Sequence, residues 1–355
     1  MSVFASKYGI ELVNPAGLLL ADLTGRASKR SLSMSRNEAE EINWTIDLDE
    51  FENFCRKSKL DPLQILVPCS TEVRIKRLGT YLAGGQMVYF STNINAREKT
   101  IEVKATGFLN LFKDRFTEEL RYYDDTEATT IASNLITESQ NLPNGDFGIV
   151  IGALVNVGHH NREYDRTNIK NALQDLTTSQ VNPFDMEFTY DKVFNTYAQI
   201  GNKRPDIIFE YPGNIISLGV PNDGTGIANE ITAIGQGFGS ESQAVAVEPD
   251  LGSQATYRLR QKLVSSNGTD DSDLGLTDVA KRELASWAFP FEVPTITISG
   301  NIAPFITDYG IGDRVLVRVR GYDTLAHINA FYRIERIELD VDDEDNETVK
   351  LYLSV

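Results

Sequence analysis

Hydrophobic and polar residues alternate over many short stretches of this chain, which is the pattern of half-buried β-strands. Residues 101–106 alternate strictly, so one face of this predicted strand is dry and the other is wet. A similar stretch at 88–94 precedes it, and the polar residues 95–99 between the two predict a hairpin. Residues 315–319 repeat the alternation with valine and arginine. The pattern therefore predicts a mainly β protein.

One predicted strand near the C-terminus changes phase along its length. Tyr332 and Ile334 share one face, whereas Ile337 and Leu339 share the other. A one-residue slip of this kind is what a β-bulge produces, so we expect a bulge near Glu335–Arg336. A polar turn and a last alternating strand follow.

Four stretches carry apolar residues at helical spacing instead. Asp47 or Asp49 is expected to cap the first of them, and Thr167 the third. The four stretches are residues 48–55, 126–140, 166–178 and 277–287. In the last one, Ala280, Leu284 and Trp287 fall at i, i+4 and i+7, so we expect the helix to pack through all three.

Composition bounds the class of protein. The chain has 355 residues, of which 41% are hydrophobic and 24% are charged, which suits a folded protein of two to four domains. No run of 18 apolar residues is present, so no membrane span is predicted. The first residues lack the features of a signal peptide, so we expect the protein to be made and folded in a cytosol.

The net charge of −17 argues against sequence-specific nucleic-acid binding, because lysine and arginine supply most of the affinity for phosphates. Two interpretations of the acidic excess stay open. It serves solubility, or it gives a surface past which a polyanion slides without sticking.

The residue types that carry most enzyme and metal chemistry are scarce. The two cysteines, Cys55 and Cys69, are expected to be buried free thiols. Three histidines, His159, His160 and His327, leave little material for catalysis or metal binding. The flanking Gly158 and Asn161 place the first two in a loop, and neighbours on a regular element would point apart.

Acidic pairs are frequent, but adjacency in sequence does not place two carboxylates across a cleft as a glycosidase requires. They are expected in solvated loops. The pairs are Glu118-Glu119, Asp124-Asp125, Asp270-Asp271 and Asp342-Asp343. The stretch Asp340–Asp345 is rich in carboxylates, but it lacks the glycine and the spaced glutamate of a calcium loop.

The stretch Gly235-Gln-Gly237-Phe-Gly239 brings its third glycine one residue early for a dinucleotide-binding motif. A glycine-rich strand, a bulge or a close backbone contact fits it better. No hydrolase, metalloprotease or phosphate-binding motif is present. We therefore assign no catalytic, cofactor-binding or metal-binding residues, expect no cofactor, and expect no enzymatic activity.

A set of segments in a fixed order resembles a known family. The order resembles the hub proteins, often called minor tail proteins, of long non-contractile phage tails. Downstream, the segments are Asn214–Ser217, Asn229–Gly237, the helix with Ala280, Leu284 and Ala285, Gly312–Val315, Tyr332–Ile334, Val341–Asp343 and Val349–Leu351. Upstream, Gly84-Gly85 and Ile101–Gly107 resemble the family's first barrel, and Asn168-Ile169 and Phe184–Tyr190 its middle region.

The resemblance implies a baseplate-hub fold, in which α+β accessory domains join two β-barrels related to the tail tube. The same fold occurs in hubs of contractile tails and in type VI secretion spikes. Three copies of such a protein close around the tail axis, and the hub itself carries no catalytic residues. Many relatives continue into a fibre or a cell-wall hydrolase, whereas this chain stops at Val355, which puts a host-binding or lytic role in doubt.

We expect four domains on this basis. Residues 1–117 form the first tube-like barrel and residues 118–206 an α+β accessory domain. Residues 207–236 and 289–355 form the second barrel, which is split by a small inserted domain at 237–288.

The implied function is structural. The chain would form a three-fold ring at the tail tip of the virion, join the tail tube to the tip, and line an acidic or neutral channel for DNA ejection. Its expected partners are further copies of itself, distal tail or tail-tube proteins, tip fibre or spike proteins and the tape-measure protein, with DNA passing unbound. Two alternatives stay open: a carbohydrate-active or carbohydrate-binding tail protein, and the spike base of a contractile secretion system. An exposed aromatic platform beside a carboxylate cleft would favour the first alternative.

Overall fold

The computed structural model describes residues 6–178, 183–235, 244–265, 273–289, 294–322 and 327–354. Strands are the main secondary structure, as predicted. Among the described helices, none combines the length and the hydrophobicity that a membrane span requires.

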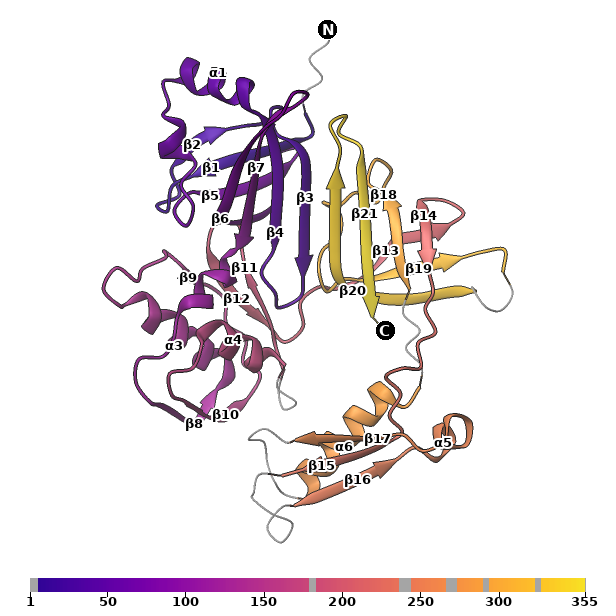
Figure 1. The fold of residues 1–355 in the computed structure, drawn as a ribbon. Coiled ribbons are helices and arrows are strands. Elements are labelled where there is room, and N and C mark those ends of the chain that lie inside the picture. The colour runs from indigo at the N-terminus through magenta and orange to yellow at the C-terminus, as the bar shows by residue number, and fades with distance from the viewer. Residues whose placement is uncertain are drawn as a thin grey trace.

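Thirteen strands form one sheet in the order β14-β18-β21-β20-β3-β4-β7-β6-β5-β1-β2, with β19 on β20 and β13 on β19 (Figure 1). We call β1–β7 the first half and the remaining six strands the second half. The first half contains β1 (Tyr8–Val13), β2 (Leu19–Asp22), β3 (Ser28–Ser35), β4 (Glu41–Asp47), β5 (Glu72–Arg77), β6 (Thr80–Ile94) and β7 (Lys99–Gly107). The second half contains β13 (Lys203–Tyr211), β14 (Ile215–Gly219), β18 (Thr295–Ser299), β19 (Arg314–Val319), β20 (Ile328–Val341) and β21 (Glu347–Ser354).

The strand β20 joins the two halves. Its first part, 328–333, pairs with β19, and its second part, 336–341, pairs with β3 of the first half. The register shifts between Ile334 and Arg336, which confirms the predicted bulge. Because a bulge bends its strand, it allows one strand to serve two differently directed neighbours. The strands of the two halves thus form one connected sheet, and its division into two tube-like barrels stays a prediction.

The two halves also share one hydrophobic core. The core residues are every second residue of a strand. In β4, for example, Ile42, Trp44 and Ile46 are buried, and the residues between them are exposed or half-buried. The same core contains residues of β21 such as Leu351. The helix α1 (Leu48–Ser58) adds Phe51 to it, and the short α2 (Pro62–Ile65) follows. The predicted β6–β7 hairpin is confirmed, and Asp47 caps α1 by accepting a hydrogen bond from the Glu50 amide.

The α+β domain has a core of its own, and the expected boundary at 117/118 is wrong, because Phe108, Leu109 and Phe112 already belong to this core. The domain contains a 3-10 helix (Phe108–Asp114), β8 (Arg121–Glu127), α3 (Ala128–Gln140), β9 (Val150–Ile151), β10 (His159–Tyr164), α4 (Ile169–Thr177), β11 (Asp185–Phe188) and β12 (Val193–Tyr197). Both predicted helices are present. The expected cap Thr167 is wrong, because the side chain of Asn168 accepts the hydrogen bond from the Asn171 amide.

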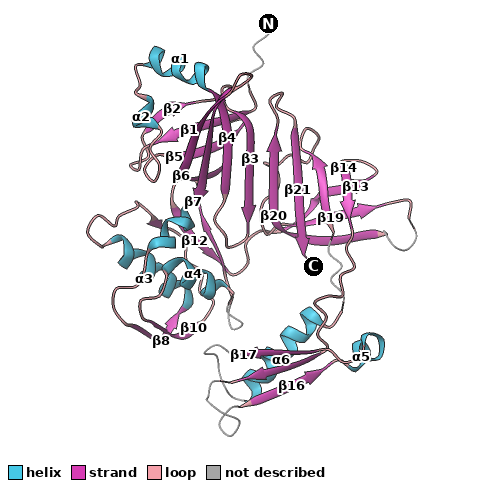
Figure 2. Ribbon diagram, in the orientation of Figure 1, coloured by secondary structure: helices cyan, strands magenta, loops and turns pink. Residues whose placement is uncertain are grey.

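The inserted domain, called the insert below, is a three-stranded sheet with one face against a helix (Figures 1 and 2). It contains β15 (Glu230–Ile234), β16 (Val245–Pro249), α5 (Leu251–Tyr257), β17 (Gln261–Ser265) and α6 (Asp273–Trp287). The expected boundary at 236/237 is wrong, because β15 pairs with β16 and β17 and not with the main sheet. The insert therefore begins before Glu230.

The predicted packing of the helix at 277–287 is partly correct. Ala280 is buried and Leu284 packs against the core of the insert. Trp287 is 39% exposed, so the third residue expected to pack is covered only in part. The reason is that Trp287 is the last residue of α6, at the edge of the small core.

Candidate functional site

The residues that the sequence suggested for chemistry do not meet in one place. His159 and His160 lie on β10 and not in a loop, which corrects that expectation. They point apart: His159 is exposed and lies 3.1 Å from the Asp125 carboxylate, whereas His160 is buried. Burial lowers the pKa of His160. His327 is exposed just before β20.

The structure corrects the expectation for one of the two cysteines. Cys55 is a buried free thiol as expected, but Cys69 is an exposed free thiol, so half of that prediction is wrong. Cys69 adopts a left-handed backbone at φ 60° in the turn before β5, which holds it at the surface. The segment that follows Gly235 lies outside the described residues. Within the described part of the chain, no group of three potential ligands could hold a metal ion.

The acidic pairs behave in different ways. Glu118-Glu119 is exposed in a bend, and Asp124-Asp125 is exposed but on β8 instead of in a loop. Asp270-Asp271 lies outside the described residues. Asp342 organises the β20–β21 turn by accepting hydrogen bonds from the amides of Glu344 and Asn346. The hydrogen bond from the Asn346 side chain, followed by those from the amides, lowers the pKa of Asp342.

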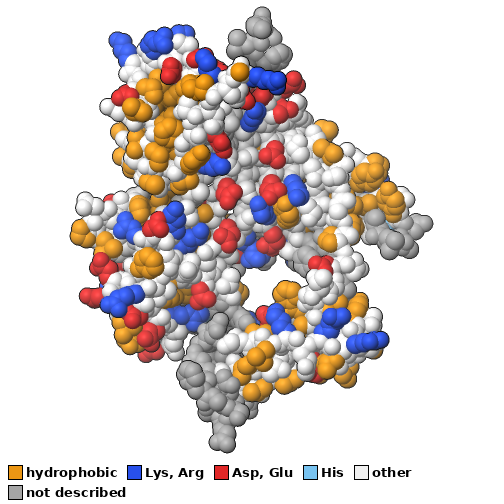
Figure 3. Space-filling model, in the orientation of Figure 1, with side chains coloured by type: hydrophobic (Ala, Val, Ile, Leu, Met, Phe, Trp, Pro, Cys, Tyr) orange, Lys and Arg blue, Asp and Glu red, His pale blue; other side chains and the backbone are white. Residues whose placement is uncertain are grey.

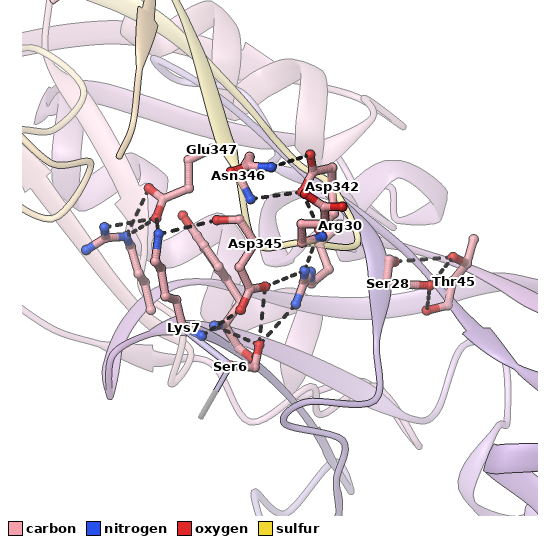
Figure 4. A network of polar contacts seen from close by, with 12 residues as sticks. Ser6, Lys7, Ser28, Arg30, Thr45, Asp342, Asp345, Asn346 and Glu347 are labelled. Atoms are coloured by element: carbon pink, nitrogen blue, oxygen red, sulfur yellow. Dashed lines mark hydrogen bonds and ion pairs between the residues drawn. The ribbon is translucent and has the colours of Figure 1, made fainter. Parts of the chain in front are cut away.

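That turn fastens the second half to the first (Figure 4). The guanidinium of Arg30, on β3, is almost fully buried and donates to Asp345 at 2.6 Å and to the Asp342 carbonyl at 2.8 Å. The Lys7 amide donates to the other Asp345 oxygen at 3.0 Å. The carboxylate of Asp345 is therefore a fastening point between the two halves, whereas Asp342 and Asp343 of the same turn are exposed, as expected for that pair.

A second ion pair lies in the interior beside this network. The Arg77 guanidinium on β5 donates to both carboxylate oxygens of Glu347 on β21, at 2.9–3.1 Å. Their side chains are 4% and 0% exposed. Burial alone would lower the pKa of Arg77, but the bonds to Glu347 raise it. Because five strands separate β5 from β21 in the sheet order, the sheet must curve strongly to bring them together.

A third fastening point ties the α+β domain to both halves. Asp185, at the start of β11, accepts from Arg36 of the first half at 2.9 Å and from Arg333 of the second half at 2.7 Å. It also accepts from the Ile200 amide at 2.8 Å. Burial opposes ionisation, but these donors hold the pKa of Asp185 below its ordinary value.

A fourth contact docks the α+β domain on the first half. The buried Lys192 ammonium donates to Glu72 on β5 at 2.8 Å, and to the carbonyls of Pro15 and Phe147 at 2.5 and 3.1 Å. Gly84 on β6 lies under the adjacent turn, where a Cβ atom would come within 2.6 Å of the Tyr190 carbonyl oxygen. The glycine that the sequence singled out thus serves a close backbone approach between two domains.

Trp287 is an exposed aromatic residue beside a carboxylate, the arrangement that would favour a carbohydrate site, but its ring and that carboxylate already contact other side chains. Its indole donates to Glu283 at 3.1 Å, and the Lys262 ammonium lies 4.1 Å from the ring centroid. Lys262 also pairs with Glu283 at 2.8 Å. The carboxylate and the ring are therefore engaged with each other and with a cation. The four fastening contacts above form a junction that connects the first half, the second half and the α+β domain.

The surface charge is mixed where it can be seen. Acidic and basic side chains are interspersed over the front face of the main sheet (Figure 3). The excess of 51 acidic over 34 basic residues is therefore not gathered into one block on this face.

The fold of the whole chain is similar to solved tail proteins. It superposes on a tail protein from Neisseria meningitidis MC58 with a TM-score of 0.70 at 14% identity, covering 98% of this chain and 96% of that one. The 43 kDa tail protein of prophage MuSo2 from Shewanella oneidensis gives 0.68 at 13% identity, covering 98% and 97%. No family model and no curated protein matches the chain by sequence.

A weaker similarity leads to secretion spikes. An E. coli component of the type VI secretion system, described as structurally similar to the T4 tail proteins gp27 and gp5, gives a TM-score of 0.51 at 10% identity, covering 93% and 73%. At these identities the likeness defines the fold. The chain therefore has the fold of phage tail proteins and baseplate hubs, as the sequence resemblance implied.

Proposed function

We propose that this chain is a structural hub of a phage tail tip, and that three copies form a ring which joins the tail tube to the tip. The observation that carries the proposal is the likeness to tail proteins over nearly the whole length of both chains. The mainly β architecture and the buried contacts between domains suit a rigid structural subunit.

The junction between the domains supports the proposed ring. A ring subunit must hold its domains at fixed angles, since every copy has to repeat the same interfaces for the ring to close. The pairs Arg77–Glu347 and Arg30–Asp345 connect the first and second halves, and Asp185 connects both to the α+β domain. If each half is tube-like, three chains present six similar units and can stack on a hexameric tube.

The channel of this ring is proposed to be acidic or neutral. Phosphates passing a basic surface would bind it with a strong salt dependence, whereas the −17 charge of the chain disfavours such sticking. A continuous belt of lysine and arginine around the channel of the assembled ring would contradict this part of the proposal.

The partners follow from the position at the tip. We expect contacts with tail-tube or distal tail proteins on one side, with tip fibre or spike proteins on the other, and with the tape-measure protein inside. The location would be the virion tail tip, after synthesis in the host cytoplasm. No catalytic role and no cofactor are proposed. We expect no catalytic defect in His159→Ala, His160→Ala, Asp342→Ala or Asp343→Ala. Hydrolysis of peptidoglycan or host polysaccharide by the purified chain that is lost in one of these variants would contradict this expectation.

Electron microscopy of purified particles tests this function directly. An antibody to the chain should label only the tail tip, and a reconstruction of the tip should contain three copies. One or two copies per tip, or label along the tail shaft, would contradict the hub.

A second candidate is the spike base of a contractile secretion system, which the similarity to the type VI component favours. The neighbouring genes separate the two candidates. Capsid and tail-tube genes beside this one support the phage hub, and secretion sheath and effector genes support the spike base.

A further inference from the structure

One face of the second half is basic, although the chain as a whole is acidic. Val315 and Val317 of β19 are buried, so the alternation of the strand turns Arg314, Leu316 and Arg318 to its opposite face. On that face Arg314 is exposed, and the other two side chains are half-buried. The open face of β19 therefore presents an apolar residue between two arginines.

The neighbouring strands extend this pattern, because side chains that are paired directly across strands share a face. On β13, Lys203 is paired with Arg314 and Ile208 with Leu316. On β20, Phe331 is paired with Leu316. The Lys203 ammonium lies 4.3 Å from the centroid of the Phe331 ring. We call these six residues the basic face: Lys203, Ile208, Arg314, Leu316, Arg318 and Phe331.

The cations of the basic face have no carboxylate partners. Within the described part of the chain, Lys203, Arg314 and Arg318 form no ion pair. The carboxylate of Glu210, which is paired in register with Arg318, already binds Arg320 at 2.6 Å. The whole chain has 51 acidic and 34 basic residues, so three cations without carboxylates on one face are a departure from its composition. Such a face suits a partner that presents carboxylates around an apolar centre.

A surface with these properties lies on the α+β domain. Phe116, Leu120 and Tyr122 are 53%, 41% and 70% exposed. Arg121, the basic residue between them, is engaged by Glu138 at 2.8 Å. Residues 116–125, which we call the acidic strip, also carry exposed carboxylates at Glu118, Glu119, Asp124 and Asp125. An exposed aromatic ring among carboxylates is a group that a basic and partly apolar face can bury.

The acidic strip and the basic face lie on opposite sides of the molecule. The strand β8, which contains the second part of the strip, is at one end of the α+β domain, and β13 and β19 are on the other side of the chain (Figure 1). The two surfaces can therefore meet between copies and not within one chain. A contact between two different surfaces of identical subunits repeats head to tail, and it closes into a ring if the rotation allows.

We propose that the acidic strip of one copy docks on the basic face of the next copy. Tyr122 would lie against Leu316 and Phe331, and the carboxylates of the strip would pair with Arg314 and Arg318. The complementary charge and the opposite placement of the two surfaces support a second copy as the partner. The proposal rests on the ring proposed above, for which it names the contact between copies.

Sedimentation velocity of the full chain tests the contact. The wild type should self-associate at about 50 mM NaCl, and its dissociation constant should rise at least about tenfold at about 500 mM, because salt screens exposed charges. Arg314→Glu combined with Arg318→Glu should raise the dissociation constant at low salt by at least about tenfold. The matched control, Lys57→Glu combined with Arg97→Glu, makes the same change of charge at exposed positions outside both surfaces and should behave as the wild type.

A charge exchange separates a lost contact from a damaged fold. Glu118→Lys combined with Asp124→Lys should weaken self-association as much as the arginine variant does. The chain with all four substitutions should associate again, because its strip is then basic and its face acidic, whereas a damaged fold would not be rescued. Circular dichroism checks that each variant is folded.

Three results would each overturn the contact. They are a wild type that stays monomeric up to about 100 µM, an equal effect of the control pair, and no rescue in the chain with four substitutions. The ring itself is tested separately, by counting copies at the tail tip. Three copies at the tip together with self-association that does not respond to the arginine substitutions would overturn this contact and leave the hub proposal standing.

Discussion

The main sheet and the insert bury their sheet faces in different ways. In the main sheet, residues of both halves enter one core, and β20 pairs with strands on both sides of the junction. In the insert, only one sheet face meets a helix, and the other leaves Val245, Val247 and Leu263 more than half exposed. The main sheet is therefore one cooperative unit, whereas the insert has its own small core.

The chain provides a separate fluorescent reporter for each region. Trp44 lies in the core of the main sheet and Trp287 at the end of α6, and these are the two tryptophans of the chain. If the main sheet and the insert unfold independently, the fluorescence of Trp44 and the fluorescence of Trp287 should change in two separate urea transitions. One shared transition would contradict the comparison.

The largest effect is expected from deleting residues 337–355. This deletion removes β21 and most of the part of β20 that pairs with β3, so both halves lose their shared strand and core. We expect no folded main sheet, measured by circular dichroism and Trp44 fluorescence. The matched deletion replaces 229–287 with a short glycine linker, because the Ala228 amide and the Trp287 carbonyl already lie 2.9 Å apart. That variant should keep the Trp44 signal.

Glu347→Ala tests the buried junction inside the main sheet. It leaves the Arg77 guanidinium buried without its counter-ion, which costs about 3–5 kcal/mol of unfolding free energy. Urea unfolding followed at Trp44 measures it. Asp343→Ala, in the exposed turn nearby, should change the same quantity by less than about 0.5 kcal/mol. Equal effects of the two substitutions would show that the ion pair does not hold the halves together.

Gly84→Ala tests the docking of the α+β domain on the first half. The new Cβ would lie 2.6 Å from a backbone oxygen of Tyr190, so the domain has to shift, at about 1–3 kcal/mol of unfolding free energy. Faster amide exchange in β11 and β12 should accompany the loss. Gly219→Ala is the control, since its nearest neighbour is 3.9 Å away. A wild-type exchange pattern in Gly84→Ala would rule out the close approach.

The pKa of Glu40 predicts a pH dependence that the insert does not share. Loss of water around the carboxylate and the negative charge of Glu187 raise the pKa of Glu40 from its ordinary 4.5 to about 7 in the folded protein. Between these pH values the folded protein therefore holds a proton which the unfolded chain has lost. The stabilising contribution is complete below about pH 4.5 and is lost as the pH rises through 7. We expect Glu40→Gln to gain about 1–2 kcal/mol over the wild type between pH 5 and pH 8. A pH-independent difference in urea unfolding would contradict it.

The smallest effect is expected for Trp287→Ala. The ring is 39% exposed, so its loss should cost about 1 kcal/mol, far less than a fully buried ring would. Amide exchange in β15 should report this loss, while the Trp44 transition stays unchanged. A shift of the Trp44 transition would mean that the two regions are coupled.

Local periodicity was enough to determine much of this protein. The alternation at 101–106 and 88–94 predicted the β6–β7 hairpin, and the phase slip at 335–336 predicted the bulge in β20. Both predictions are confirmed because side chains along a strand alternate between its two faces. The burial of each residue can therefore be inferred from the hydrophobicity of its immediate neighbours. The order of segments likewise indicated the hub fold, since a whole-chain pattern contains more information than any one motif.

Contacts between distant segments were decided only by the tertiary structure. Arg77 and Glu347 are 270 positions apart, and nothing in either neighbourhood marks them as partners. Asp345 belongs to a run of acidic residues, and nothing in that run indicates that it pairs with Arg30, 315 positions away. Trp287 has the correct helical phase, but a phase states which side chains share a face and not where the covering core ends. Partner choice depends on how the sheet curves and on which domains dock, and these are properties of the assembled chain that a local pattern does not contain.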